Sequence, residues 1–566
     1  MQDGDVARLR AHLALPLAAP VAVGMALRCA GLARQVVGDD ELHAVRAALA
    51  MPVGEILSTY RVTDHSLPLT ALYRLALDAG VPLSELALRA PPLAGSLALL
   101  ALAPALAAPL VGRRVAVVWA WLLAVLPMLV AYGSMVRSYA LVLPAATLAL
   151  VCFARFWSGE GARFAAGFAA LGALAIWLHL GAGPFALGPL AFGAASALRA
   201  PRGRDETGRV RAGDAGGPRR LAHVGASALG LALAGGALLA PAAGSLAELV
   251  ARKRGAPGAT LAIALEVAQL HAGVAGPGAL VVGALAVLGA AIGWRRGGGG
   301  RALVGCAVGG IAAQLVGLAV LAPKLDSPVV AARAWLVALP AAALCVAFGV
   351  EAVAARTRRT ALVAAAAIAA LVAAGPLPDA GRWRSAFRHH DDYLLFTRSR
   401  ARLAPPALPR FYAELASGAR ERGAVVEAPW HPFWGFGHAV PAYQEVHGED
   451  VIVANDEDYA RTDAFAWRNA VALAPAPVLR TRARWLVLHL DLEREETALR
   501  AARGAAAPAR ARTATCGAYC ARARARARRD LERAYGPPDA RGGGLVVWDL
   551  ARVRASGASA GSTAAR

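Results

Sequence analysis

The sequence predicts a polytopic α-helical membrane protein with about eleven transmembrane helices, followed by an extracytoplasmic α/β domain at its C-terminal end. Hydrophobic residues make up 57% of the 566 residues, and the mean hydropathy is +0.47. These values are typical of a membrane protein rather than a soluble domain. After residue 376 the long apolar runs stop, and charged and turn-forming residues become frequent.

The apolar runs define the predicted spans, because a helix needs about 20 apolar residues to cross the hydrocarbon core. Several runs are rich in Gly and Ala, which suits close packing of helices in lipid. The first run could instead be a signal peptide, but Arg28 stands before Cys29, where cleavage needs a small residue. The predicted spans are 11–28, 91–111, 115–133, 139–156, 164–181, 183–199, 221–243, 277–294, 302–322, 334–351 and 361–376.

The short loops predict the orientation of these spans. Alternate loops are rich in arginine, and such loops usually face the cytoplasm. This places the N-terminus in the cytoplasm and puts residues 29–90 and 377–566 outside it. The net charge of +22 lies largely between apolar runs, which favours membrane lipid over nucleic acid as a partner. We therefore expect a multi-pass protein of the inner (plasma) membrane, with residues 1–376 as its transmembrane module.

The region 377–566 has the pattern of a small α/β domain. Short runs rich in β-forming residues lie at 424–430, 450–455, 484–492 and 544–550. Helix-compatible stretches, such as 408–422 and 521–535, lie between them. Strands that alternate with helices indicate an α/β fold.

The first outer loop is acidic at one point. Asp39, Asp40 and Glu41 follow the first span in "VVGDDELHAV", and the pair Asp64 and His65 occurs later in the same loop. A loop of about 60 residues is too long for a simple connector. Ionisable groups near the membrane are costly unless they face water or a cavity. Helix capping is the alternative explanation, and for Asp39 it is the favoured one.

Chemistry suggests a use for such carboxylates. A carboxylate beside a lipid-embedded substrate can act as a general base. It takes the proton from an acceptor hydroxyl, whose oxygen then attacks a sugar carbon. The lipid-linked phosphate is the leaving group. The phosphate then needs guanidinium partners. Arg137 in "GSMVRSYAL" and Arg333 in "VAARAWLVALP" lie at the outer ends of predicted spans. Snorkelling toward lipid headgroups is the alternative for both arginines.

Four motifs occur in an order that resembles a known family. "DDELH", "DHSLPLTALYRL", "SELALRAPPLAGSLALL" and "SMVRSYALVL" follow one another within residues 30–180, and "IWLHLGAG" and "ARAWLVALPAAAL" continue the likeness. The pattern is similar to polytopic glycosyltransferases of the protein O-mannosyltransferase and lipid A aminoarabinose-transferase superfamily, including bacterial family-39-like members. That resemblance implies the GT-C fold.

The resemblance also implies roles for residues of this chain. Asp40 would be the catalytic base, and Glu41 would assist by hydrogen bonding or by contacting the acceptor or a metal. The substrate-binding residues would include Asp64, His65, Arg137, Tyr139 and His179. Arg333 is added to them as the second guanidinium candidate for the phosphate, on the chemical argument above. An interfacial, hydrogen-bonded histidine is the alternative for His179. The chain departs from the family where "DHSLPL" lacks one proline and where Val136 replaces a frequent glutamate.

The implied reaction is an inverting transfer of a sugar from a polyprenyl-phosphate donor to an extracytoplasmic acceptor, which is a glycan, a lipid or a protein. Some related enzymes use a divalent cation and others do not, so metal dependence stays open. The candidate oxygen ligands are Asp39, Asp40, Glu41 and Asp64. The alternative functions are a transporter or flippase, for which we find no internal repeat, and a non-catalytic membrane assembly protein.

Overall fold

The computed structural model describes most of the chain, in two compact units. The described residues are 3–30, 32, 36–37, 41–60, 66–199, 216–253, 260–274, 276–321, 328–356, 360–374, 408–430, 439–455, 469–491, 494–495 and 517–556. The first unit comprises Met1–Cys29, Ala47–Arg74 and Ala90–Pro378, and the second comprises Ala30–Arg46, Leu75–Arg89 and Asp379–Arg566. The boundary near residue 378 lies outside the described residues.

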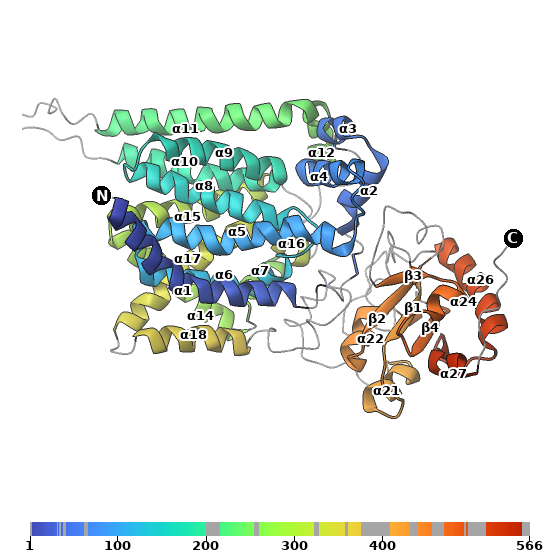
Figure 1. Cartoon of the computed structure of the whole chain (residues 1–566). Coiled ribbons are helices and arrows are strands. Elements are labelled where there is room, and N and C mark those ends of the chain that lie inside the picture. Colours follow the sequence, from blue (N-terminus) through green and yellow to red (C-terminus); the bar gives the residue numbers. More distant parts are fainter. Residues whose placement is uncertain are drawn as a thin grey trace, which may run out of the picture. The chain divides into compact units, whose positions relative to one another are not determined.

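The described residues up to 374 are mostly helical (Figure 1). Its longest helices run alongside one another, as the sequence predicts for a membrane-spanning bundle. The helices are α1 (Asp3–Cys29), α2 (Leu42–Ala50), α3 (Val53–Ser58), α4 (Leu67–Asp78), α5 (Glu85–Val111), α6 (Arg113–Val125), α7 (Pro127–Ala131), α8 (Tyr139–Trp157), α9 (Ala162–Leu178), η3 (Leu180–Ala182), α10 (Gly183–Leu198), α11 (Gly216–Leu239), η4 (Ala240–Ala242), α12 (Ala243–Lys253), α13 (Leu261–Ala272), α14 (Pro277–Arg295), α15 (Gly298–Leu321), α16 (Pro328–Trp335), η5 (Leu336–Ala338), α17 (Leu339–Ala355) and α18 (Thr360–Ala374).

Among the described residues, seven helices are long and apolar enough to cross a membrane. They match seven of the predicted runs and are Glu85–Val111, Tyr139–Trp157, Leu180–Leu198, Pro218–Ala251, Pro277–Arg295, Gly298–Val320 and Val330–Ala355. The runs predicted at 11–28, 164–181 and 361–376 also form helices, but their described apolar stretches are shorter. The total of eleven spans therefore stays a prediction.

The run predicted as one span at 115–133 is instead broken. Helix α6 ends at Val125, Leu126 is extended (φ −62°, ψ 121°), and α7 begins at Pro127. Proline has no backbone N–H to donate, and it disfavours helical geometry in the residue before it. The chain then passes through turns and bends before Tyr139 begins α8.

Glycines allow the closest helix crossings in the bundle. A Cβ at Gly188 of α10 would lie 2.2 Å from the backbone nitrogen of Gly310 in α15. A Cβ at Gly289 of α14 would lie 1.8 Å from the carbonyl oxygen of Cys345 in α17. No side chain fits at such distances. The small residues noted in the sequence thus bring these backbones into contact, as is common between helices in membranes.

Arg28, at the end of α1, is fully buried. Its Nε donates to Ser96 Oγ at 2.6 Å, and Nη1 donates to the carbonyl oxygen of Gly24 at 3.0 Å. Nη1 also donates to the carbonyl of Ala124 at 3.1 Å, and Nη2 donates to that of Leu123 at 3.0 Å. These last two carbonyls belong to the C-terminal turn of α6, where the helix dipole is negative. Arg28 therefore caps α6 and ties α1 to it.

The C-terminal part of the second unit is an α/β domain, as predicted. Its sheet has the order β3-β2-β1-β4-β6-β5. The pairs β1–β2, β2–β3 and β1–β4 are parallel, and β4–β6 and β5–β6 are antiparallel. The elements are α21 (Arg410–Ser417), β1 (Val425–Trp430), α22 (Ala439–His447), β2 (Val451–Asn455), β3 (Ala470–Ala472), α24 (Pro475–Leu479), β4 (Trp485–His489), α26 (Gly517–Tyr535), β5 (Ala540–Gly542), β6 (Leu545–Asp549) and α27 (Leu550–Ala555).

Candidate functional site

Four residues predicted from the first outer loop, Asp39, Asp40, Asp64 and His65, lie outside the described residues. Glu41, directly before α2, is described and only 5% exposed. Its Oε1 and Oε2 each lie 3.4 Å from a terminal nitrogen of Arg89, on the second turn of α5. Arg89 is itself 2% exposed. The carboxylate of Glu41 thus makes a bidentate contact with the guanidinium group of Arg89. This contact connects the start of α2 to α5.

Three other predicted residues meet in one small pocket. Tyr139, His179 and Arg333 line it together with Gly181 and Val142. Tyr139 is the first residue of α8, His179 lies between α9 and η3, and Arg333 is in the last turn of α16. The structure therefore brings together side chains from three segments that are distant in the sequence.

Aromatic contacts order the Tyr139 side of the pocket. The ring centroids of Tyr139 and His179 are 5.3 Å apart, with a tilt of 43°. Tyr132 packs edge-on against Tyr139, also at 5.3 Å. The guanidinium carbon of Arg137 lies 5.9 Å from the centre of the Tyr139 ring, within the range of a cation–π contact. Arg137 is thus placed next to the pocket through Tyr139.

The backbone fixes the orientation of the His179 ring. His179 is extended (φ −158°, ψ 112°), and its Nδ1 accepts a hydrogen bond from the backbone N–H of Gly181 at 3.1 Å. A neutral imidazole carries its single proton on the other nitrogen when one nitrogen accepts. Neutral His179 therefore has its proton on Nε2.

Gln314 of α15 was not predicted as a site residue, yet its hydrogen bonds hold the pocket together. It is fully buried. Its Nε2 donates to the carbonyls of Gly181 at 3.0 Å and Ala334 at 2.9 Å, and its Oε1 accepts from the N–H of Phe185 at 3.1 Å. Gly181 lies in η3, two residues after His179, and Ala334 directly follows Arg333. The only signal in the sequence is one amide in an apolar run.

His271 of α13 supports the same wall of the pocket. Its Nε2 lies 3.1 Å from the carbonyl oxygen of Ala332, the residue before Arg333. Gln314 and His271 thus contact the backbone on both sides of Arg333. These polar contacts set the position of α16 and therefore of the guanidinium.

No metal cluster occurs within the described part of the chain, where no three His, Cys, Asp or Glu side chains are close enough to hold an ion. Glu41 is the one described member of the predicted oxygen-ligand set, and its carboxylate contacts Arg89. Metal dependence through Asp39, Asp40 and Asp64 stays a prediction.

A second cluster of titratable groups lies inside the α/β domain. His489, at the end of β4, is fully buried between Glu427 of β1 and Glu495, with N–O distances of 2.6 and 2.7 Å. The hydroxyl of Tyr412 lies 2.9 Å from both oxygens of Glu427, and that of Tyr443 donates to Glu495 at 3.0 Å. Burial alone would lower the pKa of His489, but the two carboxylates raise that pKa to about 10.

The position of this cluster follows from the sheet order. The chain passes from β1 outward to β2 and β3, and then returns to the other side of β1 as β4. Binding sites in such sheets lie outside the carboxyl ends of the strands on either side of this reversal. Glu427 and His489 lie in these two strands, but their side chains are wholly buried. We assign the cluster to the stability of the domain.

Comparison with solved structures finds a likeness to ArnT from Cupriavidus metallidurans. The form bound to undecaprenyl phosphate is 13% identical, with a TM-score of 0.44, and the match covers 85% of this chain and 94% of that one. The apo form is 12% identical, with a TM-score of 0.43 and coverages of 85% and 93%.

The Archaeoglobus fulgidus oligosaccharyltransferase, solved in complex with zinc and sulfate, is also similar. It is 16% identical, with a TM-score of 0.36, and the match covers 86% of this chain and 69% of that one. No protein-family model matches the chain, and no curated protein does. The function proposed below therefore rests on the residues of this chain.

Proposed function

We propose that the chain is an inverting membrane glycosyltransferase, which moves a sugar from a polyprenyl-phosphate donor to an acceptor outside the cytoplasm. The observation that carries the proposal is the meeting of Tyr139, His179 and Arg333 in one pocket. The motif order in residues 30–180 supports it, because that order is similar to the GT-C transferases. Helices of membrane-spanning length supply the lipid-facing surface that a prenyl chain needs.

Asp40 is the proposed base. It takes the proton from the acceptor hydroxyl, and the acceptor oxygen attacks the anomeric carbon on the face opposite the phosphate. The bond between that carbon and the phosphate oxygen breaks, and its electron pair leaves with the polyprenyl phosphate. The configuration at the carbon is inverted. The pairing of Glu41 with Arg89 holds the backbone directly after Asp40.

The pocket acts on the leaving group. Arg333 neutralises the charge that develops on the phosphate. His179 donates from Nε2 to a phosphate oxygen, since its Nδ1 accepts from Gly181. The free volume of the pocket, about 10 Å³, holds roughly one water molecule. We therefore expect α16 to move apart from His179 and η3 when a sugar phosphate binds.

The test uses purified protein in proteoliposomes with a panel of polyprenyl-phosphate sugars and an extract of envelope acceptors. Release of polyprenyl phosphate that depends on both protein and acceptor supports the proposal. Arg333→Gln should lower the rate about 100-fold, as expected for a group that stabilises developing charge. The control is Arg163→Gln, because Arg163 is exposed at the start of α9. Movement of intact donor across the bilayer without cleavage would instead indicate a flippase.

A further inference from the structure

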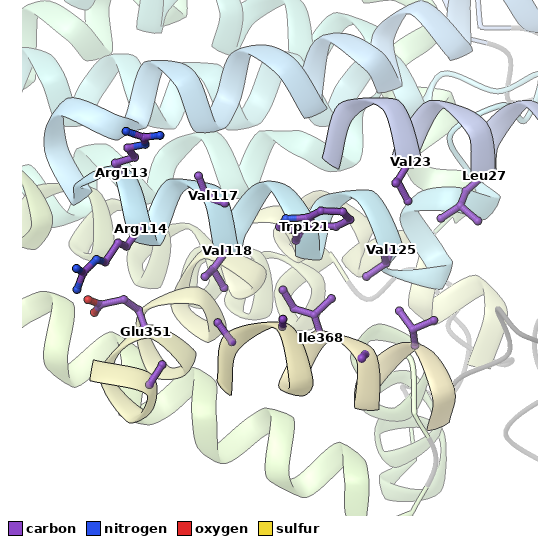
Figure 2. Close-up of a pocket in the computed structure, with 15 residues that line it drawn as sticks. Val23, Leu27, Arg113, Arg114, Val117, Val118, Trp121, Val125, Glu351 and Ile368 are labelled. Atoms are coloured by element: carbon purple, nitrogen blue, oxygen red, sulfur yellow. The ribbon is translucent and has the colours of Figure 1, made fainter. Parts of the chain in front are cut away.

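A wide apolar groove runs between α1, α6, α17 and α18, separate from the pocket described above (Figure 2). Its volume is about 960 Å³. Its walls include Val23 and Leu27 of α1, Trp121 of α6 and Ile368 of α18. Apart from three charged residues at one end, all its lining side chains are Ala, Val, Leu, Ile or Trp. A groove this apolar suits a hydrocarbon chain.

The charged end of the groove is basic. Arg113 and Arg114, the first two residues of α6, line this end and are exposed, and Glu351 of α17 lies beside Arg114 (Figure 2). Glu351 already forms an ion pair with Arg296, so it does not cancel the charge of both arginines. Two adjacent guanidinium groups at the mouth of an apolar groove complement an anionic headgroup that carries an acyl chain.

The length of the groove fits one leaflet of a bilayer. The groove follows α6 from Arg113 to Val125, a distance of about 18 Å at 1.5 Å per residue. Half of a hydrocarbon core is about 15 Å thick. The arginine-rich loops predict that this end faces the cytoplasm, where the leaflet is rich in anionic lipid.

We infer that this groove binds an anionic phospholipid of the membrane, with an acyl chain along α6 and the headgroup phosphate between Arg113 and Arg114. The polyprenyl donor is a poorer fit. The proposed partner of its phosphate is Arg333, which lines a pocket with Tyr139 at the start of α8. Arg113 and Arg114 begin α6, and α6 and α7 separate them from Tyr139 along the chain. The lipid site is independent of the proposed transfer reaction and holds even if that proposal fails.

Native mass spectrometry of the full-length protein in detergent tests the inference. The probes are phosphatidylglycerol and phosphatidylcholine with the same acyl chains. The wild type should retain phosphatidylglycerol in preference to phosphatidylcholine. The variant Arg113→Gln/Arg114→Gln should weaken phosphatidylglycerol binding about tenfold, the scale expected for two arginines beside an anionic headgroup.

Two further variants separate the groove from general surface charge. Arg219→Gln/Arg220→Gln removes another adjacent and exposed arginine pair, near the start of α11, and should leave binding unchanged. Ala365→Phe keeps both arginines of the site but fills the groove that Ala365 lines, and should abolish the preference. Equal binding of the two lipids by the wild type would overturn the inference, as would unchanged binding in both groove variants. Displacement of phosphatidylglycerol by one equivalent of undecaprenyl phosphate would also overturn it, since the groove would then hold the donor.

Discussion

Glu41 faces Arg89 through both of its carboxylate oxygens, each 3.4 Å from a guanidinium nitrogen. Both side chains are buried, so removal of one takes this ion pair away from a charge that stays buried. We predict that Arg89→Gln lowers the free energy of unfolding by about 3 kcal/mol, measured by chemical unfolding in detergent. The double variant Glu41→Gln/Arg89→Gln should regain at least half of this loss. Equal losses in the single and double variants would contradict a stabilising pair.

Gln314 joins the two sides of the Tyr139, His179 and Arg333 pocket. Gln314→Leu leaves the carbonyls of Gly181 and Ala334 without this donor, at a cost of about 1–3 kcal/mol in stability. In the transfer assay we expect a higher KM for the donor and a smaller change in kcat, because the residue positions the pocket and does not react. Gln269→Leu is the control, since the one contact described for the Gln269 side chain is the hydrogen bond that its Oε1 accepts from the Gly276 N–H. A normal KM in Gln314→Leu would refute the positioning role.

Arg28 caps the last turn of α6 from inside the bundle. Arg28→Met removes the donors to Ser96, Leu123 and Ala124, and three buried acceptors lose their partner. We predict a loss of about 2–4 kcal/mol in stability, seen as a lower Tm of the purified protein. Arg163→Met, at an exposed position, should leave the Tm within about 1 °C, because exposed substitutions usually change stability little. An unchanged Tm in Arg28→Met would show that α6 does not need this cap.

The buried His489 predicts a pH dependence of stability. Its pKa is raised to about 10 in the folded domain by Glu495 and Glu427, against the opposing effect of burial, whereas an unfolded histidine titrates near 6.5. The folded state therefore holds this proton more tightly. The resulting stability is fully present below about pH 6.5 and is lost as the pH rises toward 10.

Thermal unfolding of the full chain between pH 6 and 10.5 measures this dependence. The fall in Tm should be flatter in His489→Gln than in the wild type. His447→Gln is the matched control, because burial lowers the pKa of His447 to about 3 and the ring stays neutral throughout the window. Identical slopes in the wild type and His489→Gln would contradict a charged His489.

The sequence predicts the long elements well, because each span or central strand needs a continuous apolar run. The break between Val125 and Pro127 was missed, since the run stays apolar across it and only the proline marks it. Strands β3 and β5 were also missed. Each has three residues, too few for a periodic pattern.

Only some residues of the candidate site could be predicted from the sequence. Tyr139 and His179 were named through motif resemblance, and Arg333 was named as a guanidinium partner for a phosphate. The structure brings the three together. Gln314 and Arg28 were not predicted as site or capping residues. Their importance comes from backbone carbonyls on other helices, and no local pattern in the sequence encodes such contacts. The partner of Glu41, Arg89, lies 48 residues away and was likewise not foreseen.

The central claim is sugar transfer with Asp40 as the base, and the most direct measurement compares Asp40→Asn with Asp39→Asn. Both variants remove one carboxylate from the same acidic run and are checked for folding by size-exclusion chromatography and Tm. Transfer from a polyprenyl-phosphate sugar in proteoliposomes is then measured. We predict a loss of at least about 100-fold in Asp40→Asn, the usual scale for a general base, and near wild-type rates in Asp39→Asn. A folded Asp40→Asn protein that transfers sugar at the wild-type rate would contradict the account.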